Sequence, residues 1–407
     1  MGALLQFPGG APAGASDGAP AGASNGFSDG GPVGQGAWPE QSRLWWLLWS
    51  GCPGLGWSRL AQIQALFGSW AEAWQAPIGL FEALPGFGPR LGQRLGHYRE
   101  RWGPQPLDQL RRQGVGRRVL LPGDRPFPRS MGELERPPLA LYWQGQGSLW
   151  PLLQGRRAIA VVGTRHPSLH GQSMAHAIGS ALARAGWPVV SGLAEGIDGA
   201  AHRGCLAAGG RPVAVLGTPL ERVYPRHHAE LQRQVGVSGL LVSEQGPGVP
   251  VKAGHFAARN RLQVALASGV VLVECPLKSG ALLSAELAWR EQLPLWVVPA
   301  DAGKASAAGS NRLLAQGRSV LLDPADLIRQ LGPGPLAAPG LAEPAGPRRL
   351  SAVRPDPELM VAVGQGASLE QLCLALDQPA ATLASRLLQL ELAGELRAEP
   401  GLCWSPL

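Results

Sequence analysis

The sequence has few cysteines, and their spacing indicates neither disulfide bonds nor a metal centre. Five cysteines are scattered over 407 residues, none in a CxxC pair or near a histidine at metal-ligand spacing. The sequence also lacks the run of about eighteen uncharged apolar residues that a membrane-spanning helix needs. The first residues, MGALLQFPGG, have no basic region and no apolar core of a signal peptide. We therefore expect a protein of the reducing cytoplasm, with no membrane partner.

Lysine is scarce, whereas arginine is abundant. Lysine occurs only at Lys252, Lys278 and Lys304, among 36 basic residues, and the formal net charge is +7. A basic protein of this kind suits a polyanionic partner such as nucleic acid. A GC-rich genome explains a surplus of arginine equally well, so the charge alone does not identify a partner. All three lysines lie in the middle part of the chain, which directs attention to that region.

Composition and periodicity divide the chain into five parts. Residues 1–40 repeat GAPAGAS and bury too little apolar surface to fold, which predicts a disordered tail. Residues 41–144 have apolar residues three and four positions apart, which predicts a helical domain and a connector. Residues 145–332 predict an α/β domain, residues 333–350 have the composition of a flexible linker, and residues 351–407 predict a small winged-helix domain.

The helical domain contains two glycine turns, at residues 53–63 and 84–95. Each has a Gly-apolar-Gly segment followed by a helical pattern. Such turns are typical of helix-hairpin-helix units, whose backbone amides hold a DNA phosphate at a helix N-terminus. Plain connections between helices have the same glycine pattern, so both interpretations stay open.

The middle domain alternates short apolar runs with helical stretches. Unbroken apolar runs indicate strands that are buried on both faces of a sheet. Together with the intervening helices they predict a Rossmann-like, doubly wound parallel sheet. The predicted strands are residues 158–163, 188–192, 212–217, 240–244, 269–274 and 294–299.

The last part of the chain predicts two or three helices followed by two short strands around a Pro-Gly turn. This order is typical of a winged helix, with residues 379–394 in the position of the recognition helix. That stretch carries a single arginine, Arg386, so contact with a protein is at least as good an interpretation as contact with DNA.

In open parallel sheets, ligands bind just beyond the carboxyl ends of the strands. Small residues, hydroxyls and cations dominate there, and this composition favours phosphate. The candidates are Gly163, Thr164, Arg165, Ser191, Gly192, Gly217, Thr218, Ser243, Glu244, Glu274, Lys278, Ser279 and Gly280. Neither GxGxxG nor GxxxxGK[ST] occurs at these turns, which argues against NAD, FAD and ATP. We therefore expect no cofactor and a polymeric or unusual phosphate ligand.

Few residues suggest catalysis. Asp198 and His202 lie four positions apart on a predicted helix, but we expect Asp198 to cap that helix and His202 to pack nearby. Glu274 and Glu286 have acid or base chemistry, yet no nucleophile or metal cluster accompanies them. The sequence therefore predicts a protein that is not an enzyme.

The segment before residue 269 favours binding instead. Lys252 and the trio Arg259, Asn260 and Arg261 supply cations and an amide, and Phe256 supplies a ring on which a base can stack. We expect the trio to begin a helix, where cations oppose the helix dipole, and to stand at the rim of a pocket. Such a departure from a local rule indicates a functional site, although a solvated basic turn is the alternative.

Seven segments, in order, resemble the DNA-processing protein A family (DprA, also called Smf) of bacterial natural transformation. They are AIAVVGTRHPSLHG, VVSGLAEGIDGAAH, VAVLGTPLERVYP, LLVSEQGPG, HFAARNRLQVALASGVVLVE, KSGALLSAELA and GSNRLLAQG. The resemblance implies a Rossmann-like domain that binds single-stranded DNA in a positive pocket, forms a homodimer, protects incoming strands and loads the recombinase RecA. The implied DNA-binding residues are Gly163, Thr164, Arg165, Ser191, Gly192, Lys252, Phe256, Arg259, Asn260, Arg261, Lys278, Ser279 and Gly280.

The sequence departs from this family at several positions. Glu195 stands where the family usually has arginine, which puts a negative charge beside the implied pocket. A second resemblance, to the lysine-decarboxylase-like nucleoside monophosphate phosphoribohydrolases, implies an acid site of Gly280, Ser284 and Glu286. Those enzymes have a double-glycine turn before the acid, whereas this chain has one glycine next to Lys278.

Overall fold

A computed structural model describes the chain as two compact units. The first is Met1–Phe127 with Pro138–Ala140, and the second is Pro128–Pro137 with Leu141–Leu407. The described residues are 38–112, 118–337, 357–364, 366–392, 395–399 and 403–406. The expected disordered tail, up to residue 37, and most of the expected linker lie outside these ranges.

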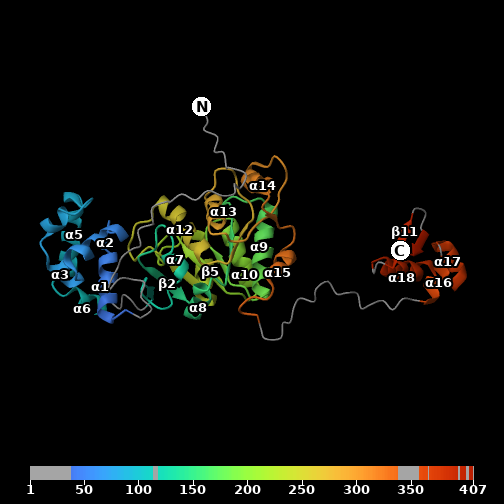
Figure 1. Cartoon of the computed structure of the whole chain (residues 1–407), viewed down its shortest axis with the longest axis horizontal. Helices are drawn as coiled ribbons and strands as arrows, with labels where there is room; N and C mark the ends of the chain where they lie inside the picture. The colour runs from blue at the N-terminus through green and yellow to red at the C-terminus, as the bar shows by residue number, and fades with distance from the viewer. Residues whose placement is uncertain are drawn as a thin grey trace, which may run out of the picture. The chain divides into compact units, whose positions relative to one another are not determined.

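The first unit is helical (Figure 1), and its core is aromatic. Its elements are α1 (Glu40–Ser50), α2 (Trp57–Phe67), α3 (Trp70–Gln75), α4 (Ile78–Glu82), α5 (Gly88–Trp102), α6 (Pro106–Arg112) and β1 (Val119–Leu120). The fully buried Trp49 of α1 lies 5.3 Å from the ring of Trp74 and 6.2 Å from that of Phe81. Large rings bury much apolar area for each residue ordered, which stabilises these short helices.

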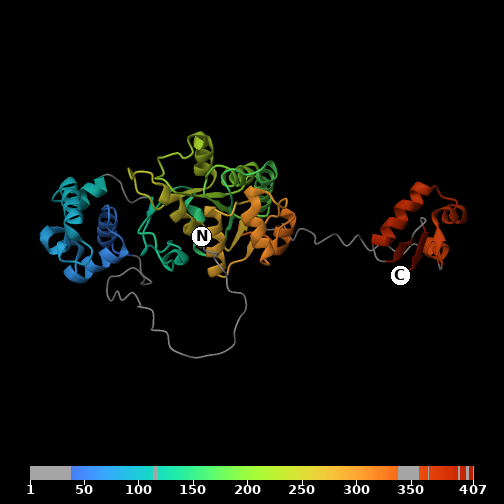
Figure 2. The ribbon, with the colours of Figure 1, turned by 90° about the horizontal axis from the view of Figure 1, so that it is seen from above.

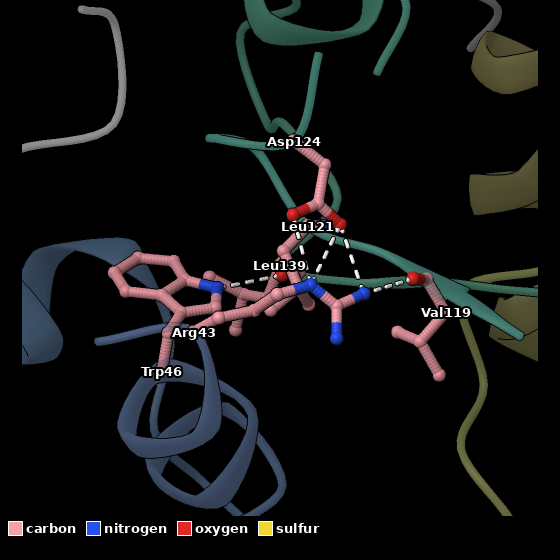
Figure 3. Close-up of polar contacts among 6 residues, drawn as sticks. All are labelled: Arg43, Trp46, Val119, Leu121, Asp124 and Leu139. Atoms are coloured by element: carbon pink, nitrogen blue, oxygen red, sulfur yellow. Dashed lines mark hydrogen bonds and ion pairs between the residues drawn. The ribbon is translucent and has the colours of Figure 1, made fainter. Parts of the chain in front are cut away.

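A polar contact joins α1 to the segment that follows β1 (Figure 3). The guanidinium of Arg43 donates to both carboxylate oxygens of Asp124, at 2.9 and 3.0 Å, and to the carbonyl of Val119. The indole of Trp46 donates to the carbonyl of Leu139 at 2.8 Å. Asp124 also accepts from the backbone N–H of Leu121 at 2.9 Å. Bidentate pairing of this kind fixes both partners in orientation.

Arg59 connects the two glycine turns of this unit. Its guanidinium donates to the carbonyl of Gly54 at 2.8 Å and to that of Gly86 at 3.0 Å. Both glycines have positive φ, +95° and +76°, a conformation that side chains disfavour. The turns are therefore held next to each other, as two hairpins of one unit.

The second unit is a mixed α/β structure (Figures 1 and 2). Its elements up to residue 337 are α7 (Arg129–Gly132), β2 (Leu141–Gly145), η1 (Gly147–Leu149), α8 (Trp150–Gln154), β3 (Ile159–Val162), α9 (Leu169–Arg184), β4 (Val189–Ser191), α10 (Ile197–Ala207), β5 (Pro212–Leu216), η2 (Arg226–His228), α11 (Ala229–Ser238), β6 (Leu240–Ser243), α12 (Ala253–Ala265), β7 (Gly269–Leu272), α13 (Gly280–Arg290), β8 (Leu295–Val297), η3 (Ala305–Ala307), α14 (Ala308–Ala315), β9 (Ser319–Val320) and α15 (Pro324–Leu331).

The sheet of the second unit is mostly parallel. Its strands run in the order β2-β6-β5-β4-β3-β7-β8-β9, and β2 is antiparallel to β6. The six predicted strands are confirmed as β3 to β8. Side chains of α9, α10 and α15 pack with those of β3, β7 and β8 in one apolar cluster. The predicted mixed α/β fold with a mostly parallel sheet is therefore confirmed.

The last described residues form a smaller cluster of helices and strands. They comprise α16 (Pro357–Val363), β10 (Ala367–Ser368), α17 (Leu369–Leu376), α18 (Ala380–Leu392), β11 (Leu396–Glu399) and β12 (Cys403–Pro406). The strands form an antiparallel sheet in the order β10-β12-β11. Leu372, Leu387 and Trp404 lie in its buried core. No helix in the described ranges is both long and apolar enough to cross a bilayer.

Candidate functional site

The strand order of the second unit changes direction at β3. Strands β4, β5 and β6 follow on one side of β3, and β7, β8 and β9 on the other. At such a point the connections diverge and leave a crevice at the carboxyl ends of the strands. We call the turns after β3, β4, β5 and β7, together with the amino-terminal ends of α12 and α13, the carboxyl edge.

Three glycines at the carboxyl edge allow close packing. A Cβ atom on Gly163 would lie 2.5 Å from Ile197, and one on Gly217 would lie 2.7 Å from the ring of Phe256. A Cβ atom on Gly192 would overlap the guanidinium of Arg259. The glycines after β3, β4 and β5 therefore bring neighbouring elements into contact.

Glu274 anchors the turn after β3. Its backbone carbonyl accepts from the N–H of Thr164 at 2.7 Å, and its carboxylate accepts from the hydroxyls of Ser168 at 2.6 Å and Ser306 at 2.5 Å. Burial acts to raise the pKa of Glu274, but the hydrogen bonds from these serines outweigh it and hold the pKa below its usual range. Glu274 is therefore a charged structural anchor, with its oxygens already occupied.

An aromatic and cationic platform is exposed at the carboxyl edge. The exposed Arg165 guanidinium lies over the ring of Phe256, 5.2 Å from its centroid. The ring centroids of Tyr224 and Phe256 lie 4.9 Å apart, and Tyr224 is 47% exposed. The structure therefore brings the predicted Arg165 and Phe256 together and adds Tyr224 to them.

Arg259 lies in the interior, which corrects the expectation that it stands at the rim. It is 3% exposed. Its guanidinium donates to the carbonyl of Val215 and lies 3.9 Å from the carboxylate of Asp198. Burial lowers the pKa of Arg259 to about 10 and raises that of Asp198. The charge of Arg259 is the ion-pair partner of the buried Asp198, whose carboxylate also has hydrogen-bond partners at Ser191, Gly192 and Ala194.

Arg261 and Asn260 also have partners within the chain. The guanidinium of Arg261 pairs with both oxygens of Glu244, at 2.6 and 3.0 Å, and donates to the carbonyl of Arg136 at 2.9 Å. The amide of Asn260 donates to the carbonyl of Gly280 at 2.9 Å and so connects α12 to the first turn of α13. These two side chains fix the position of α12.

The expectation that Arg259–Arg261 begins a helix is wrong. Helix α12 begins at Ala253, with Lys252 at its N-cap, and no side chain caps it by a hydrogen bond. Ala253 and Gly254 carry none of the usual capping signals, so the sequence does not mark this start. The trio lies in the middle of the helix, and its cations do not oppose the helix dipole there.

The remaining candidates lie at helix starts or inside the sheet. Lys252 and Lys278 are exposed. Ser279 is the N-cap of α13 and accepts from the N–H of Ala281 at 3.2 Å. Ser191 is fully buried and donates to the carbonyl of Val161 at 2.6 Å. The hydroxyl of Ser191 is therefore part of the sheet and is not presented to a ligand.

The residues considered for catalysis do not form an acid–base site. Asp198 does not cap α10, contrary to expectation, because the N-cap is Gly196 and Asp198 is buried in the first turn. His202 packs in the interior as predicted, and burial lowers its pKa to about 3. Ser284 is fully buried, whereas Glu286 lies at the surface and pairs with Arg290 at 2.6 Å.

Sequence reasoning missed Tyr224. Its signal was present, because an aromatic residue next to a proline follows β5 at the edge where ligands bind. His227 and His228, two and three positions beyond Pro225, were also passed over. They lie beside Glu195, the residue that departs from the family pattern.

These features define an α/β protein whose mostly parallel sheet has a cationic and aromatic carboxyl edge. The family model for DNA recombination-mediator protein A matches residues 118–332. The chain belongs to this family. Protein Smf of Synechocystis is 34% identical over 74% of this chain and 75% of its own length, and Protein Smf of Escherichia coli is 33% identical over 69% and 76%.

A solved structure shows the same architecture. The X-ray structure of DNA processing protein A (DprA) from Streptococcus pneumoniae matches 70% of this chain and 96% of its own, with a TM-score of 0.57 and 26% identity. The chain thus has a DprA-like fold and belongs to a family of DNA-processing proteins.

Proposed function

We propose that the carboxyl edge of the second unit binds single-stranded DNA during DNA processing in natural transformation. The observation that carries the proposal is the group of the exposed Arg165 and Tyr224 with the half-buried Phe256, in which a cation and two rings are in contact. Unpaired strands are bound by such combinations, because cations hold the backbone while rings stack on bases.

In this proposal, the DNA phosphates are contacted by Arg165, Lys252 and Lys278. All three are exposed, and among the described residues none of them makes an ion pair within the chain. A cation without an internal partner is available to a phosphate. The turn of Gly163, Thr164 and Arg165 places the first of these cations directly beyond the central strand β3.

The remaining candidates support this surface from beneath. Arg259 fills the space left by Gly192, and Asn260 and Arg261 hold α12 against its neighbours. Their role in DNA binding is to keep Phe256 in place over Gly217. We expect selectivity for unpaired strands, because stacking on Phe256 and Tyr224 requires bases that are not already stacked in a duplex.

Fluorescence anisotropy with a labelled oligonucleotide, competed by unlabelled duplex over a salt series, tests the proposal. We expect tight, salt-dependent binding that duplex displaces poorly. Arg165→Ala should reduce the slope of log affinity against log salt by about 0.7, the value for one contact to a single strand. Arg184→Ala, an exposed arginine in the last turn of α9, is the matched control. Equal displacement by duplex, or equal slopes for the two variants, would contradict the proposal.

The wider role includes a homodimer that protects incoming strands and delivers them to RecA in the cytoplasm. Family membership supports this part. Light scattering after gel filtration measures the dimer, and RecA filament assembly on strands coated with single-strand-binding protein measures delivery. A monomer, or no acceleration of assembly, would remove the corresponding part of the role.

The proposal also assigns a fold to the helical first unit and to the last part of the chain. The glycine turns joined by Arg59 act as helix-hairpin-helix units, and residues 357–406 form a winged helix. The order of helices and the antiparallel strands β11 and β12 support the latter. Removal of residues 351–407 separates the contribution of the winged helix from that of the carboxyl edge, whose strand affinity should remain.

A further inference from the structure

Three potential metal ligands meet beside the carboxyl edge, in the loop after β4 and in η2. The carboxylate of Glu195 lies 2.5 Å from Nε2 of His227 and 4.0 Å from Nε2 of His228. One ligand atom from each of the three residues lies within 4.8 Å of the other two. Sequence spacing did not reveal this group, because Glu195 and the histidines are more than thirty residues apart and meet only through the fold.

His228 is oriented as metal-binding histidines are. Its Nδ1 lies 3.0 Å from the backbone carbonyl of Leu193. A carbonyl only accepts hydrogen bonds, so Nδ1 carries the proton and Nε2 of the neutral ring keeps its lone pair. A hydrogen bond from the second nitrogen to a carbonyl is the usual arrangement that fixes the ring of a metal ligand.

Packing holds this ring in place. His228 is 3% exposed, and a Cβ atom on Gly199 would lie 2.8 Å from its Cε1 atom. The side chains of His227 and Glu195 are 65% and 42% exposed. One buried ligand therefore lies at the base of the group, and two exposed ligands at the surface have the room to rotate to the ligand separation of roughly 3.3 Å that tetrahedral Zn²⁺ needs.

We infer that Glu195, His227 and His228 bind a divalent transition-metal ion, for which Zn²⁺ is the best match. Two imidazoles and one carboxylate are a zinc ligand set, and with three protein ligands a fourth position stays open. The ion also reverses the local charge, because Glu195 alone contributes one negative charge and the occupied group carries a net positive charge.

The charge reversal has a consequence that rests on the proposed function. Glu195 lies three residues beyond Gly192 on the turn after β4, where a negative charge repels a DNA phosphate. With the ion bound, the same position attracts a phosphate, and the open coordination position is available to a phosphate oxygen. Zn²⁺ is therefore expected to strengthen single-strand binding.

Isothermal titration of the full chain with Zn²⁺, after removal of bound metal with a chelator, tests the site without DNA. We expect one site in the wild type and a loss of affinity of more than about tenfold in Glu195→Gln and in His227→Ala. Both changes are at exposed side chains and leave the buried His228 intact. His176→Ala, which removes an exposed histidine of α9, is the matched control and should bind as the wild type does.

Equal Zn²⁺ affinity in His227→Ala and the wild type, or no Zn²⁺ binding by the wild type, would overturn the inference. Glu195 and His227 would then form only a surface contact. Absorption bands of bound Co²⁺ give a second readout, since tetrahedral nitrogen and oxygen ligands produce a visible spectrum that should disappear in His227→Ala.

Anisotropy with labelled single-stranded DNA, with and without Zn²⁺, tests the consequence separately. We expect Zn²⁺ to raise the affinity of the wild type and to leave that of His227→Ala unchanged. Zn²⁺ binding without this effect would refute the link to DNA and leave the metal site in place. Absence of DNA binding under both conditions would refute the proposed function, and the titration result would stand independently of it.

Discussion

Arginines at and behind the carboxyl edge occupy two different regions. The inner region contains Arg259 and Arg261, which have carboxylate and carbonyl partners within the chain. The outer region contains Arg165, which is exposed and lies over Phe256. The same residue type therefore stabilises the scaffold in one region and is available to a ligand in the other. The difference teaches that a basic motif is not by itself a DNA contact.

The inner arginines act through the geometry of their neighbours. Taking a guanidinium out of water is costly unless its donors and its charge are satisfied. Arg259 meets this condition in part, because its guanidinium donates to the carbonyl of Val215 and lies beside the carboxylate of Asp198, whereas its buried Nε has no hydrogen-bond partner. Arg261 meets it with Glu244. Each inner arginine consequently holds two segments together, and a change there is expected to alter stability first and DNA binding only through it.

Arg259→Ala should break the inner region with the largest effect. The change leaves Asp198 buried without its partner, and such a loss costs about 3–5 kcal/mol. Urea unfolding of the full chain measures it, with Arg184→Ala as the control for loss of an exposed arginine. Unchanged stability together with a large loss of single-strand affinity would show that Arg259 is a ligand contact after all.

His202→Gln should change how the stability of the interior around Arg259 depends on pH. The pKa of His202 is about 3 in the fold, against an ordinary 6.5. Between these values the unfolded chain binds one proton more than the folded chain, so the wild type loses stability as pH falls below 6.5. The variant should lack this contribution to the pH dependence of the unfolding free energy, which is about 1.4 kcal/mol per pH unit. Urea unfolding at pH 7, 6 and 5 measures it, and identical pH slopes for the two proteins would contradict a buried neutral imidazole.

Gly192→Ala should disturb the contact between the turn after β4 and Arg259. The added Cβ atom overlaps the guanidinium, and overpacking of this kind costs about 1–3 kcal/mol. Gly254→Ala is the matched control, because its Cβ atom would have nothing within 4 Å and alanine favours a helix. Thermal unfolding compares the two, and equal melting temperatures would show that Arg259 moves aside freely.

Phe256→Ala should break the outer region with a smaller effect, in binding. Loss of one stacked base costs about 1–3 kcal/mol of single-strand affinity, while the half-buried ring leaves stability largely unchanged. Anisotropy at fixed salt measures the affinity, and Tyr224→Ala should act in the same direction. A fall in melting temperature with unaltered affinity would place Phe256 in the core.

The sequence predicted the sheet well and the inner arginines poorly. Strands β3 to β8 are unbroken apolar runs, and their burial on both faces follows directly from that pattern. The two-residue strands β1, β9 and β10 were missed because they are too short to show a period. The burial of Arg259 depends on Asp198 and on the space at Gly192, and both come from segments more than fifty residues away.

The sequence predicted which residues gather at the candidate site, but it did not predict which of them are exposed and which are buried. Arg165 was found because motif and strand end coincide, and Phe256 because it belongs to a basic motif. Tyr224 was missed because its contact with Phe256 joins the loop after β5 to helix α12. Packing determines which cations are exposed, and a linear motif such as Arg259–Arg261 does not indicate it.

Hydrogen–deuterium exchange of the full chain, with and without single-stranded DNA, tests the central claim most directly. The account predicts new protection at residues 163–166, 252–258 and 278–282, and none in the last turn of α9 near Arg184. Protection confined to residues 38–112 or 357–406, with the carboxyl edge unchanged, would contradict it.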